Sequence, residues 1–193
     1  MNRLLLALAI ITTPSLCSAQ EWLCKMTHSV IVSQDSNGRS VETKQWSGVA
    51  VAPDLILSVA HSITNGEAKA EFEGGTVVAT VIKFDKDRDL ALFKATGTLK
   101  PIKIAKERPR LAKILGFAMG HKKVVSYPVS ATIAYVIPTE HLLVMDGEAF
   151  HGMSGGPVLN ENGELVGIQS SGDKAMTMAS SPEQIKSFLN SRP

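Results

Sequence analysis

The chain has 193 residues, of which 44% are hydrophobic and 20% charged, and its formal net charge is +2. This length fits one medium domain or two small ones, and the near-average composition indicates neither a disordered chain nor a membrane bundle. Because the lysines and arginines are dispersed and aromatic residues make up only 5%, we expect no nucleic-acid partner.

The first nineteen residues differ from the rest of the chain. Arg3 supplies a positive charge, residues 4–11 form an apolar run, and residues 17–19 end it with small side chains. This pattern is typical of a secretory signal cleaved near Ala19, and the run is too short to span a bilayer. An uncleaved anchor or a buried N-terminal helix is the alternative. We expect a secreted or periplasmic protein that leaves the membrane after cleavage.

Removal of that signal leaves Cys24 as the last cysteine of the mature chain. An internal disulfide is then impossible, so the fold must depend on its apolar core. In an exported protein such a cysteine pairs with another molecule or stays buried as an apolar residue. The packed strand expected around residues 22–24 favours burial.

Short runs rich in β-branched residues follow one another along the first half of the mature chain, bounded by turn-forming residues. A hairpin turn is expected at residues 35–38, and Pro53-Asp54 marks a second turn. The expected strands are residues 30–32, 41–45, 47–52, 55–59, 76–84 and 90–94.

The pattern breaks near residues 105–110, where charge concentrates and Pro109 disfavours strand pairing. We place a linker here, which divides the chain into a signal 1–19, a domain 20–105 and a domain 106–193. Two similar sets of closely spaced strands predict two small antiparallel β-barrels. The strands expected in the second set are residues 112–117, 124–129, 131–137, 142–144, 157–159 and 165–168.

A short helix is expected to close the chain. Ser181 is a capping residue, Pro182 suits the first helical position, and Gln184 completes a capping box. Ile185, Phe188 and Leu189 recur at helical spacing and give this helix an apolar face.

Ser154 lies among the glycines Gly152, Gly155 and Gly156. A serine hydroxyl is a poor nucleophile unless a base takes its proton and donors stabilise the oxyanion. Gly152 allows the amides of Gly152 and Ser154 to point into one small hole, and the later glycines permit close backbone approach. The alternative is a glycine-rich turn with an incidental serine.

Two other segments supply the partners that such a serine needs. His61 comes directly after the buried strand at 55–59, where a rigid element can hold its ring. Asp89 begins the apolar strand at 90–94, a good position to accept a hydrogen bond from imidazole. Asp85 and Asp87 lie in the same charged turn and are expected to be solvated.

These three segments resemble, in order and in local sequence, the trypsin-like serine peptidases, most closely the bacterial HtrA-type and glutamyl endopeptidase-like branch. Residues 58–61 stand where that family has alanine-alanine-histidine, and residues 87–91 where it has aspartate-leucine-alanine. Residues 152–157 match its glycine-x-serine-glycine-glycine motif. With residues 47–49 and 163–168, the resemblance spans nearly the whole mature chain.

The resemblance implies an all-β, chymotrypsin-like fold of two antiparallel six-stranded β-barrels with a short C-terminal helix and the site between the barrels. His61, Asp89 and Ser154 would be the catalytic triad, and the amides of Gly152 and Ser154 the oxyanion hole. It further implies that Ser170 hydrogen-bonds Asp89, and that Ser170, Ser171 and Gly172 pair with the substrate as an added strand.

Two features depart from the family pattern. Met153 replaces the aspartate that digestive members pair with a newly exposed N-terminus, so we expect an enzyme competent once exported and folded. The chain ends 39 residues after Ser154, which leaves no room for the peptide-binding module of HtrA proteins.

The offset of Glu148 from Ser154 places it at the base of the pocket for the residue before the cut, where it would favour lysine or arginine. A rim position on a loop is the open alternative. His151 could contact substrate or lie exposed on its loop. His28, His121 and His141 lack zinc-ligand spacing, and we expect no metal and no cofactor.

The leading hypothesis is a serine endopeptidase that acts on polypeptides. The alternative is a catalytically silent relative that keeps the two-barrel fold as a binding module. A structural protein with a coincidental Gly-Ser turn would require three independent accidents. Natural substrate and oligomeric state stay open.

Overall fold

The computed structural model describes residues 21–35, 38–63, 66–106, 111–119, 124–129, 135–136 and 142–191. The expected signal, part of the expected linker, His121 and His141 lie outside these residues, so the domain boundaries stay predictions. Within the described ranges, no helix is long and apolar enough to cross a membrane.

The first half of the fold is a closed antiparallel barrel with the strand order β1-β2-β3-β6-β5-β4. It closes where residues 25–27 of β1 pair with residues 69–71 of β4. Its interior is filled by apolar side chains such as Ile56, Leu57 and Phe93. The expected first six-stranded barrel is therefore confirmed. Its strands are β1 (Leu23–Asp35), β2 (Gly38–Ala52), β3 (Leu55–Ser58), β4 (Glu67–Phe72), β5 (Gly75–Asp85) and β6 (Leu90–Ala95).

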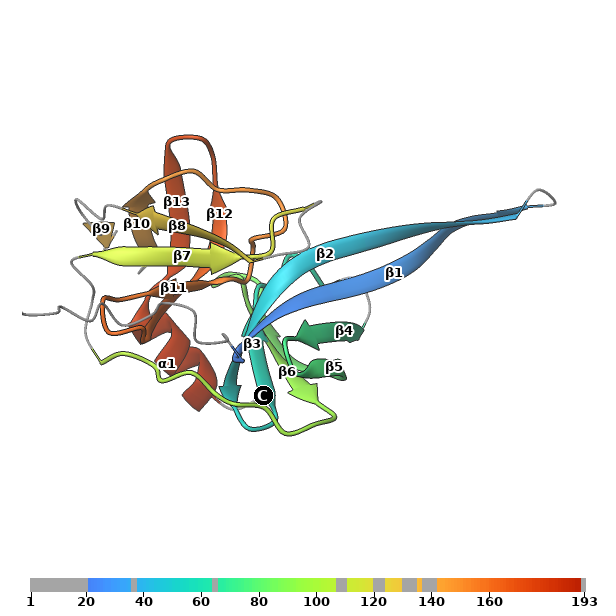
Figure 1. The fold of residues 1–193 in the computed structure, drawn as a ribbon, viewed down its shortest axis with the longest axis horizontal. Coiled ribbons are helices and arrows are strands. Elements are labelled where there is room, and N and C mark those ends of the chain that lie inside the picture. Colours follow the sequence, from blue (N-terminus) through green and yellow to red (C-terminus); the bar gives the residue numbers. More distant parts are fainter. Residues whose placement is uncertain are drawn as a thin grey trace, which may run out of the picture.

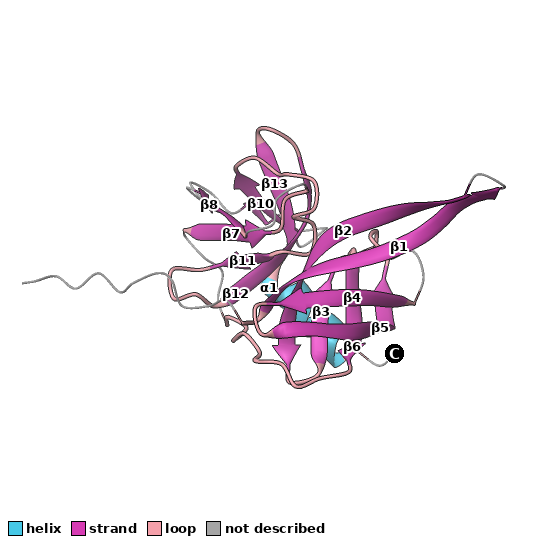
Figure 2. Cartoon of the chain, turned by 45° about the vertical axis from the view of Figure 1, so that its right-hand side comes forward, coloured by secondary structure: helices cyan, strands magenta, loops and turns pink. Residues whose placement is uncertain are grey.

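Strands β1 and β2 are much longer than the rest of the barrel requires. They pair from Leu23–Val49 out to Asp35–Gly38, and the far end of this ribbon projects from the body of the molecule (Figures 1 and 2). Near the body, the same β2 strand carries Ser47, which enters the site described below. Asp35 and Gly38, at the ends of the expected turn, form the last pair of this hairpin, and residues 36–37 lie outside the described residues.

The second half is a seven-stranded antiparallel sheet with the order β8-β7-β11-β12-β13-β10-β9. The sheet does not close over the described residues, so a second six-stranded barrel is not what the structure shows. Its end strand β8 contains Pro128, which lacks an amide hydrogen and suits an edge. The strands are β7 (Ala112–Gly116), β8 (Val125–Val129), β9 (Tyr135–Val136), β10 (Leu142–Asp146), β11 (Pro157–Leu159), β12 (Leu165–Gly172) and β13 (Met176–Ser180).

The C-terminal helix α1 (Pro182–Asn190) begins at the expected capping box. Ser181 Oγ accepts from the amide of Gln184 at 3.2 Å, and Gln184 Oε1 accepts from the amide of Ser181 at 3.1 Å. These bonds satisfy donors that a helix start leaves without intrahelical partners. The prediction of a short capped helix is confirmed.

Helix α1 joins the two halves of the molecule. Its buried Ile185 and Phe188 belong to the same apolar cluster as Phe93 of the barrel. The last turn of α1 has no basic residue of its own. Lys83 of β5 supplies the cation, because its ammonium donates to the carbonyls of Phe188 and Ser191 and lies 4.7 Å from the centre of the Phe188 ring.

Cys24 is a free cysteine buried in the barrel core. Burial raises the pKa of its thiol because a thiolate would lose its hydration there. The expectation that Cys24 acts as an apolar core residue is confirmed.

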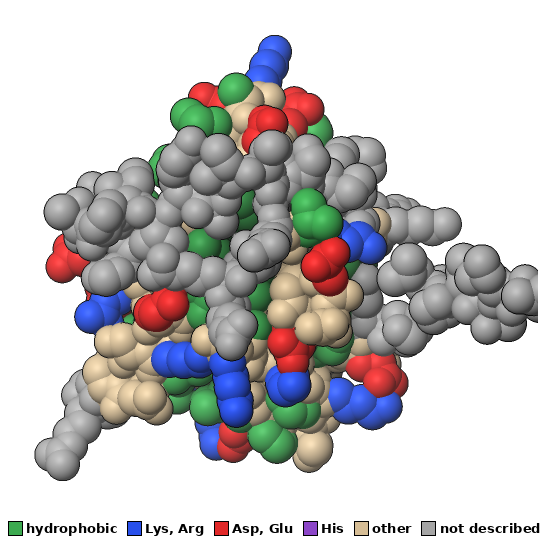
Figure 3. Space-filling model, turned by 90° about the vertical axis from the view of Figure 1, so that its left-hand side faces the viewer, with side chains coloured by type: hydrophobic (Ala, Val, Ile, Leu, Met, Phe, Trp, Pro, Cys, Tyr) green, Lys and Arg blue, Asp and Glu red, His purple; other side chains and the backbone are tan. Residues whose placement is uncertain are grey.

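Charged side chains of both signs are intermixed on the surface. Figure 3 shows this on one face, and ion pairs such as Lys25–Glu71 and Lys103–Glu164 neutralise charges locally. Such pairs on a protein surface add little stability. On that face, the coloured side chains gather into no large field of one sign.

Candidate active site

His61 and Asp89 are brought together by the pairing of two neighbouring barrel strands. β3 ends three residues before His61, β6 begins directly after Asp89, and Ser58 of β3 pairs with Ala91 of β6. The carboxylate of Asp89 accepts from His61 Nδ1 at 2.7 Å and from the His61 amide at 2.8 Å. Asp89 therefore fixes both the ring and the backbone of His61.

The backbone of Asp89 has a φ of +52°, in the left-handed region that most side chains avoid. Aspartate tolerates this region better than most residues, and such conformations are frequent at functional sites. The turn before it is held by Asp85, whose Oδ1 accepts from the amides of Asp87 and Arg88 at 3.0 Å. Asp85 thus supports the turn, and Asp87 is exposed as expected.

Asp89 stays ionised because its hydrogen bonds outweigh its burial. Burial alone would raise its pKa, but hydrogen bonds from the His61 ring, from Ser170 and from the His61 amide bring the pKa below its ordinary value. An ionised carboxylate at Nδ1 requires the proton of a neutral imidazole to sit on that nitrogen. Nε2 of His61 is then left as a proton acceptor.

Ser170 of β12 links the barrel to the second half of the molecule. Its hydroxyl donates to Asp89 Oδ2 at 2.5 Å, which is the hydrogen bond expected from the family resemblance. Its carbonyl accepts from the hydroxyl of Ser154 at 3.3 Å. Through Ser170, the three segments named from the sequence meet in one hydrogen-bonded group.

The hydroxyl of Ser154 points toward Ser170 rather than toward His61. Between these two described residues, His61 and Ser154, the structure has no hydrogen bond. Catalytic hydrogen bonds are often long or poorly aligned when no substrate is bound. Among the described residues, Ser154 is therefore linked to the imidazole–carboxylate pair through Ser170.

The glycines around Ser154 are required by the geometry of its turn. Gly152 and Gly155 have φ values of +91° and +83°. A Cβ atom on Gly155 would lie 2.1 Å from the carbonyl oxygen of Ser47 and 2.2 Å from Ser58 Oγ. Only glycine avoids both the strain and the clash.

The amides of Gly152 and Ser154 are oriented through the carbonyls of the residues before them, because each of these carbonyls accepts a hydrogen bond. Met119 donates to the carbonyl of His151 at 2.6 Å, and Gly156 donates to the carbonyl of Met153 at 2.8 Å. In a trans peptide the N–H points away from the C=O, so the N–H groups of Gly152 and Ser154 point away from these contacts. Neither donates to a protein acceptor in the described structure.

The expected substrate-binding strand has a free side. Beyond Gln169 the register shifts at Ser170, and Ser171 and Gly172 pair with β13 on one edge. No described strand pairs with the other edge of residues 170–172. Gly172 packs against Ala149, where an added Cβ would lie 2.6 Å from the Ala149 Cβ. Ser171 is exposed.

Glu148 lies on the segment that leads from β10 to Ser154. The amides on either side of it, those of Gly147 and Ala149, donate to the carbonyls of Ala175 and Asp173 in the β12–β13 hairpin. Glu148 is exposed, and so is His151. The backbone bonds place Glu148 beside the expected substrate strand, with its carboxylate open to solvent.

Two buried serines also belong to this region, although no motif or spacing singles them out. Ser47 of β2 donates from Oγ to the carbonyl of Gly152 at 2.9 Å, and Ser58 of β3 donates to the carbonyl of Ser47 at 2.6 Å. The sequence near Ser47 shows only the family resemblance of residues 47–49. The contact of Ser47 with Gly152 joins residues more than a hundred positions apart.

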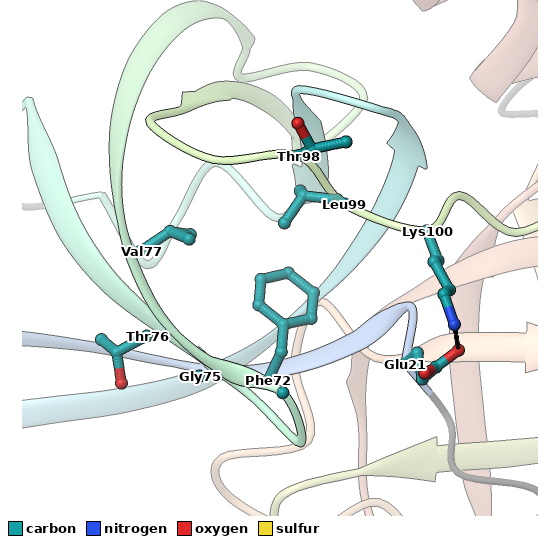
Figure 4. Close-up of a pocket in the computed structure, with 9 residues that line it drawn as sticks. Glu21, Phe72, Gly75, Thr76, Val77, Thr98, Leu99 and Lys100 are labelled. Atoms are coloured by element: carbon teal, nitrogen blue, oxygen red, sulfur yellow. Dashed lines mark ion pairs between the residues drawn. The ribbon is translucent and has the colours of Figure 1, made fainter.

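A separate cavity of about 260 Å³ opens in the first barrel (Figure 4). Phe72, Val77 and Leu99 give it apolar walls, and the ion pair Glu21–Lys100 lies at its side. His61, Asp89 and Ser154 do not line it. This cavity is therefore not part of the candidate active site.

Comparisons with known proteins were made at the level of sequence families and of structures. Residues 46–168, more than half of the chain, match the family model of the trypsin-like peptidase domain. This span includes His61, Asp89 and Ser154. No curated protein matches the chain.

Solved structures with a similar fold include the Rv3671c protease from M. tuberculosis. The match to its active form has a TM-score of 0.72 at 16% identity and covers 91% of this chain and 84% of the Rv3671c chain. Its inactive form has a TM-score of 0.70 at 16% identity, with 89% and 88% covered. At this identity the likeness shows the fold alone, whereas the match of the family model shows the family. The chain belongs to the trypsin-like peptidases and is a serine endopeptidase.

Proposed function

We propose that His61, Asp89 and Ser154 form the catalytic triad of this endopeptidase, and that the amides of Gly152 and Ser154 form its oxyanion hole. The observation that carries the proposal is the hydrogen-bonded group that joins His61 and Asp89 to Ser154 through Ser170. The group combines residues from both halves of the fold, as catalysis in a cleft between them requires.

In the proposed mechanism, the Ser154 hydroxyl turns from the Ser170 carbonyl to His61. Nε2 takes its proton while Oγ bonds to the substrate carbonyl carbon, and the carbonyl electron pair moves to oxygen. The free amides stabilise this oxyanion, and Asp89 stabilises the imidazolium. His61 then protonates the leaving amine, and water releases the acyl group by the same steps.

The alternative is a silent relative that only binds its partner. Two features favour catalysis. The carboxylate at Nδ1 leaves Nε2 of His61 ready to accept a proton, and the amides of Gly152 and Ser154 have no acceptor among the described residues. In a collapsed oxyanion turn, these two amides would donate hydrogen bonds to carbonyls of the protein.

A fluorophosphonate probe tests the proposal directly, since only an activated serine displaces its fluoride and forms a phosphonate ester. We expect one adduct per folded molecule, located by mass spectrometry of the digested protein on the peptide that contains Ser154. Heat-denatured protein is the control and should not react. Absence of an adduct, or an adduct on another serine, would contradict the proposed triad.

The substrate is proposed to be an extended polypeptide that adds to the free side of residues 170–172. Backbone hydrogen bonds at this edge would supply affinity without demanding one sequence. Preference for particular side chains then depends on the surroundings of Glu148 and Gly172. Glu148 lies beside that edge, although its exposure leaves open whether it forms the base of the pocket or its rim.

If Glu148 serves the pocket, a peptide library should show preferred cleavage after lysine or arginine. In Glu148→Gln this preference is expected to weaken by up to about fivefold, since an exposed charge pair contributes at most about 1 kcal/mol. Glu161→Gln, an exposed glutamate on the β11–β12 turn, is the matched control. An unchanged preference in Glu148→Gln would remove Glu148 from the pocket.

The proposal places this enzyme outside the cytoplasm, on the strength of the signal-like residues 1–19. It also places the chain in the HtrA-type and glutamyl endopeptidase-like branch, on the strength of the three motifs. Met153 is buried in an apolar cluster, as expected of a residue that replaces an ion-pairing aspartate. We therefore propose activity without an activating cleavage beyond signal removal.

A further inference from the structure

Ser47 of β2 is fully buried and contacts the Ser154 turn from the other half of the molecule. Its amide donates to the carbonyl of Ser154 at 2.8 Å, and its hydroxyl donates to the carbonyl of Gly152 at 2.9 Å. One residue of the barrel thus holds two carbonyls of the segment 151–155, which we call the oxyanion turn.

These two bonds complete the restraint of the oxyanion turn. The peptide units 151–152 and 153–154, which carry the free amides, are held through their carbonyls by Met119 and Gly156. The units between and after them, 152–153 and 154–155, are held by the hydroxyl and the amide of Ser47. Four successive peptide planes are therefore fixed, and Ser47 fixes every second one.

The same hydroxyl also restrains the segment beside the turn. Ser47 Oγ accepts from the amide of Phe117 at 2.9 Å. Phe117 begins the stretch 117–119, in which Met119 holds the carbonyl of His151 and the Phe117 carbonyl abuts Gly152. Ser47 Oγ therefore holds both the Gly152 carbonyl and the segment that packs against Gly152. Its O–H donor and one of its acceptor lone pairs are used in these two bonds.

Ser47 is also tied to the strand that precedes His61. The buried Ser58, at the end of β3, donates to the carbonyl of Ser47 at 2.6 Å. Gly155 packs so closely here that an added Cβ would contact both serines. A continuous set of hydrogen bonds thus runs from the histidine strand through Ser47 to the oxyanion turn.

We propose that Ser47 is a positioning residue that holds the Gly152 and Ser154 amides in the geometry that stabilises the oxyanion. It contacts neither substrate nor reacting atoms, and it acts through the carbonyls of the oxyanion turn. This inference rests on the proposed function of that turn. It assigns to a barrel residue the alignment of donors that belong to the other half of the fold.

The test is Ser47→Ala, which removes the hydroxyl and leaves the Ser47 amide in place. For a peptide ester, kcat is expected to fall about 10- to 100-fold, while KM changes by less than about twofold. This decrease in kcat does not exceed the one caused by removing an oxyanion-hole donor completely. A peptide boronic acid, which places an oxygen where the oxyanion forms, should bind weaker by the same factor as kcat falls.

Ser180→Ala is the matched control. Ser180 is also buried, and its hydroxyl accepts from the amide of Ile168 at 3.1 Å in the second sheet. Among the described residues, this hydroxyl makes no hydrogen bond to the oxyanion turn. Both variants should lose stability in urea unfolding, but Ser180→Ala should keep kcat and boronic acid affinity. If the two variants retain kcat alike, Ser47 is only structural and the inference is wrong.

Two further measurements keep the outcome decisive. If Ser47→Ala does not fold, Ser47→Cys, which has nearly the same shape but a weak donor, is measured in its place with the same expectation. Wild-type protein is first tested with the fluorophosphonate probe. No reaction of Ser154 there would overturn the proposed function itself, whereas a reactive wild type with unimpaired Ser47 variants would overturn only the role of Ser47.

Discussion

Ser154→Ala is expected to lower kcat for peptide hydrolysis about 10⁶-fold, because loss of the nucleophile in a triad leaves only binding and the oxyanion donors. The variant should still bind substrate, since the edge of β12 at residues 170–172 and the Glu148 segment are unchanged. A fluorogenic peptide measured at high enzyme concentration gives kcat, and the catalytically dead variant gives a direct dissociation constant for the same peptide.

Ser187→Ala is the control for this change, because Ser187 is an exposed serine of α1 that lies outside the proposed site. It should keep the activity of the wild type. Activity within tenfold of the wild type in Ser154→Ala would show that another group is the nucleophile. Circular dichroism of both variants excludes a loss of fold as the cause.

The sequence predicted those elements whose signals are local. The capping box at Ser181 and Gln184 and the β-branched runs of the first barrel correspond to α1 and to most of the observed strands. Strand β4 was missed because its sequence, Glu67–Phe72, consists mainly of glutamate, alanine and lysine, which favour helices. It is a strand because Ala68 and Ala70 are buried where β4 closes the barrel.

The candidate site was only partly predictable for a related reason. His61 and Asp89 lie next to strand ends, and the strand pattern of the sequence predicts these positions. The glycines around Ser154 predict a tight turn. Ser47 and Ser58 look like ordinary serines of buried strands, and their role depends on contacts between distant segments. The openness of the second sheet likewise depends on which strands pair, which strand patterns alone do not determine.

Asp89→Asn is expected to lower kcat about 10⁴-fold at neutral pH with little change in fold, because an asparagine in this place enforces the wrong tautomer of the histidine. The left-handed backbone at φ +52° suits asparagine as well as aspartate. The substitution therefore removes the charge while the turn that carries it is retained. Steady-state kinetics of the purified variant measure the effect.

The hydrogen bonds of Asp89 explain the expected tautomer change. Oδ1 accepts from the His61 amide, and Oδ2 accepts from both His61 Nδ1 and Ser170 Oγ. With the asparagine oxygen kept at the His61 amide, its NH₂ group faces Nδ1, which must then accept. The ring proton moves to Nε2, and His61 can no longer take the proton of Ser154. If the asparagine side chain were flipped, its NH₂ group would face the backbone N–H of His61, and two hydrogen-bond donors would oppose each other.

The pKa of Asp89 gives this prediction a second readout. Because the folded-state pKa lies below the ordinary value of 3.8, the ionised carboxylate stabilises the fold at neutral pH, and this contribution is lost as the pH falls through that lowered pKa. The difference in unfolding free energy between wild type and Asp89→Asn should therefore shrink as the pH falls below about 4. Asp87→Asn, an exposed neighbour in the same turn, should alter neither kcat nor this pH dependence. A variant Asp89→Asn with wild-type kcat would show that the carboxylate does not orient His61 for catalysis.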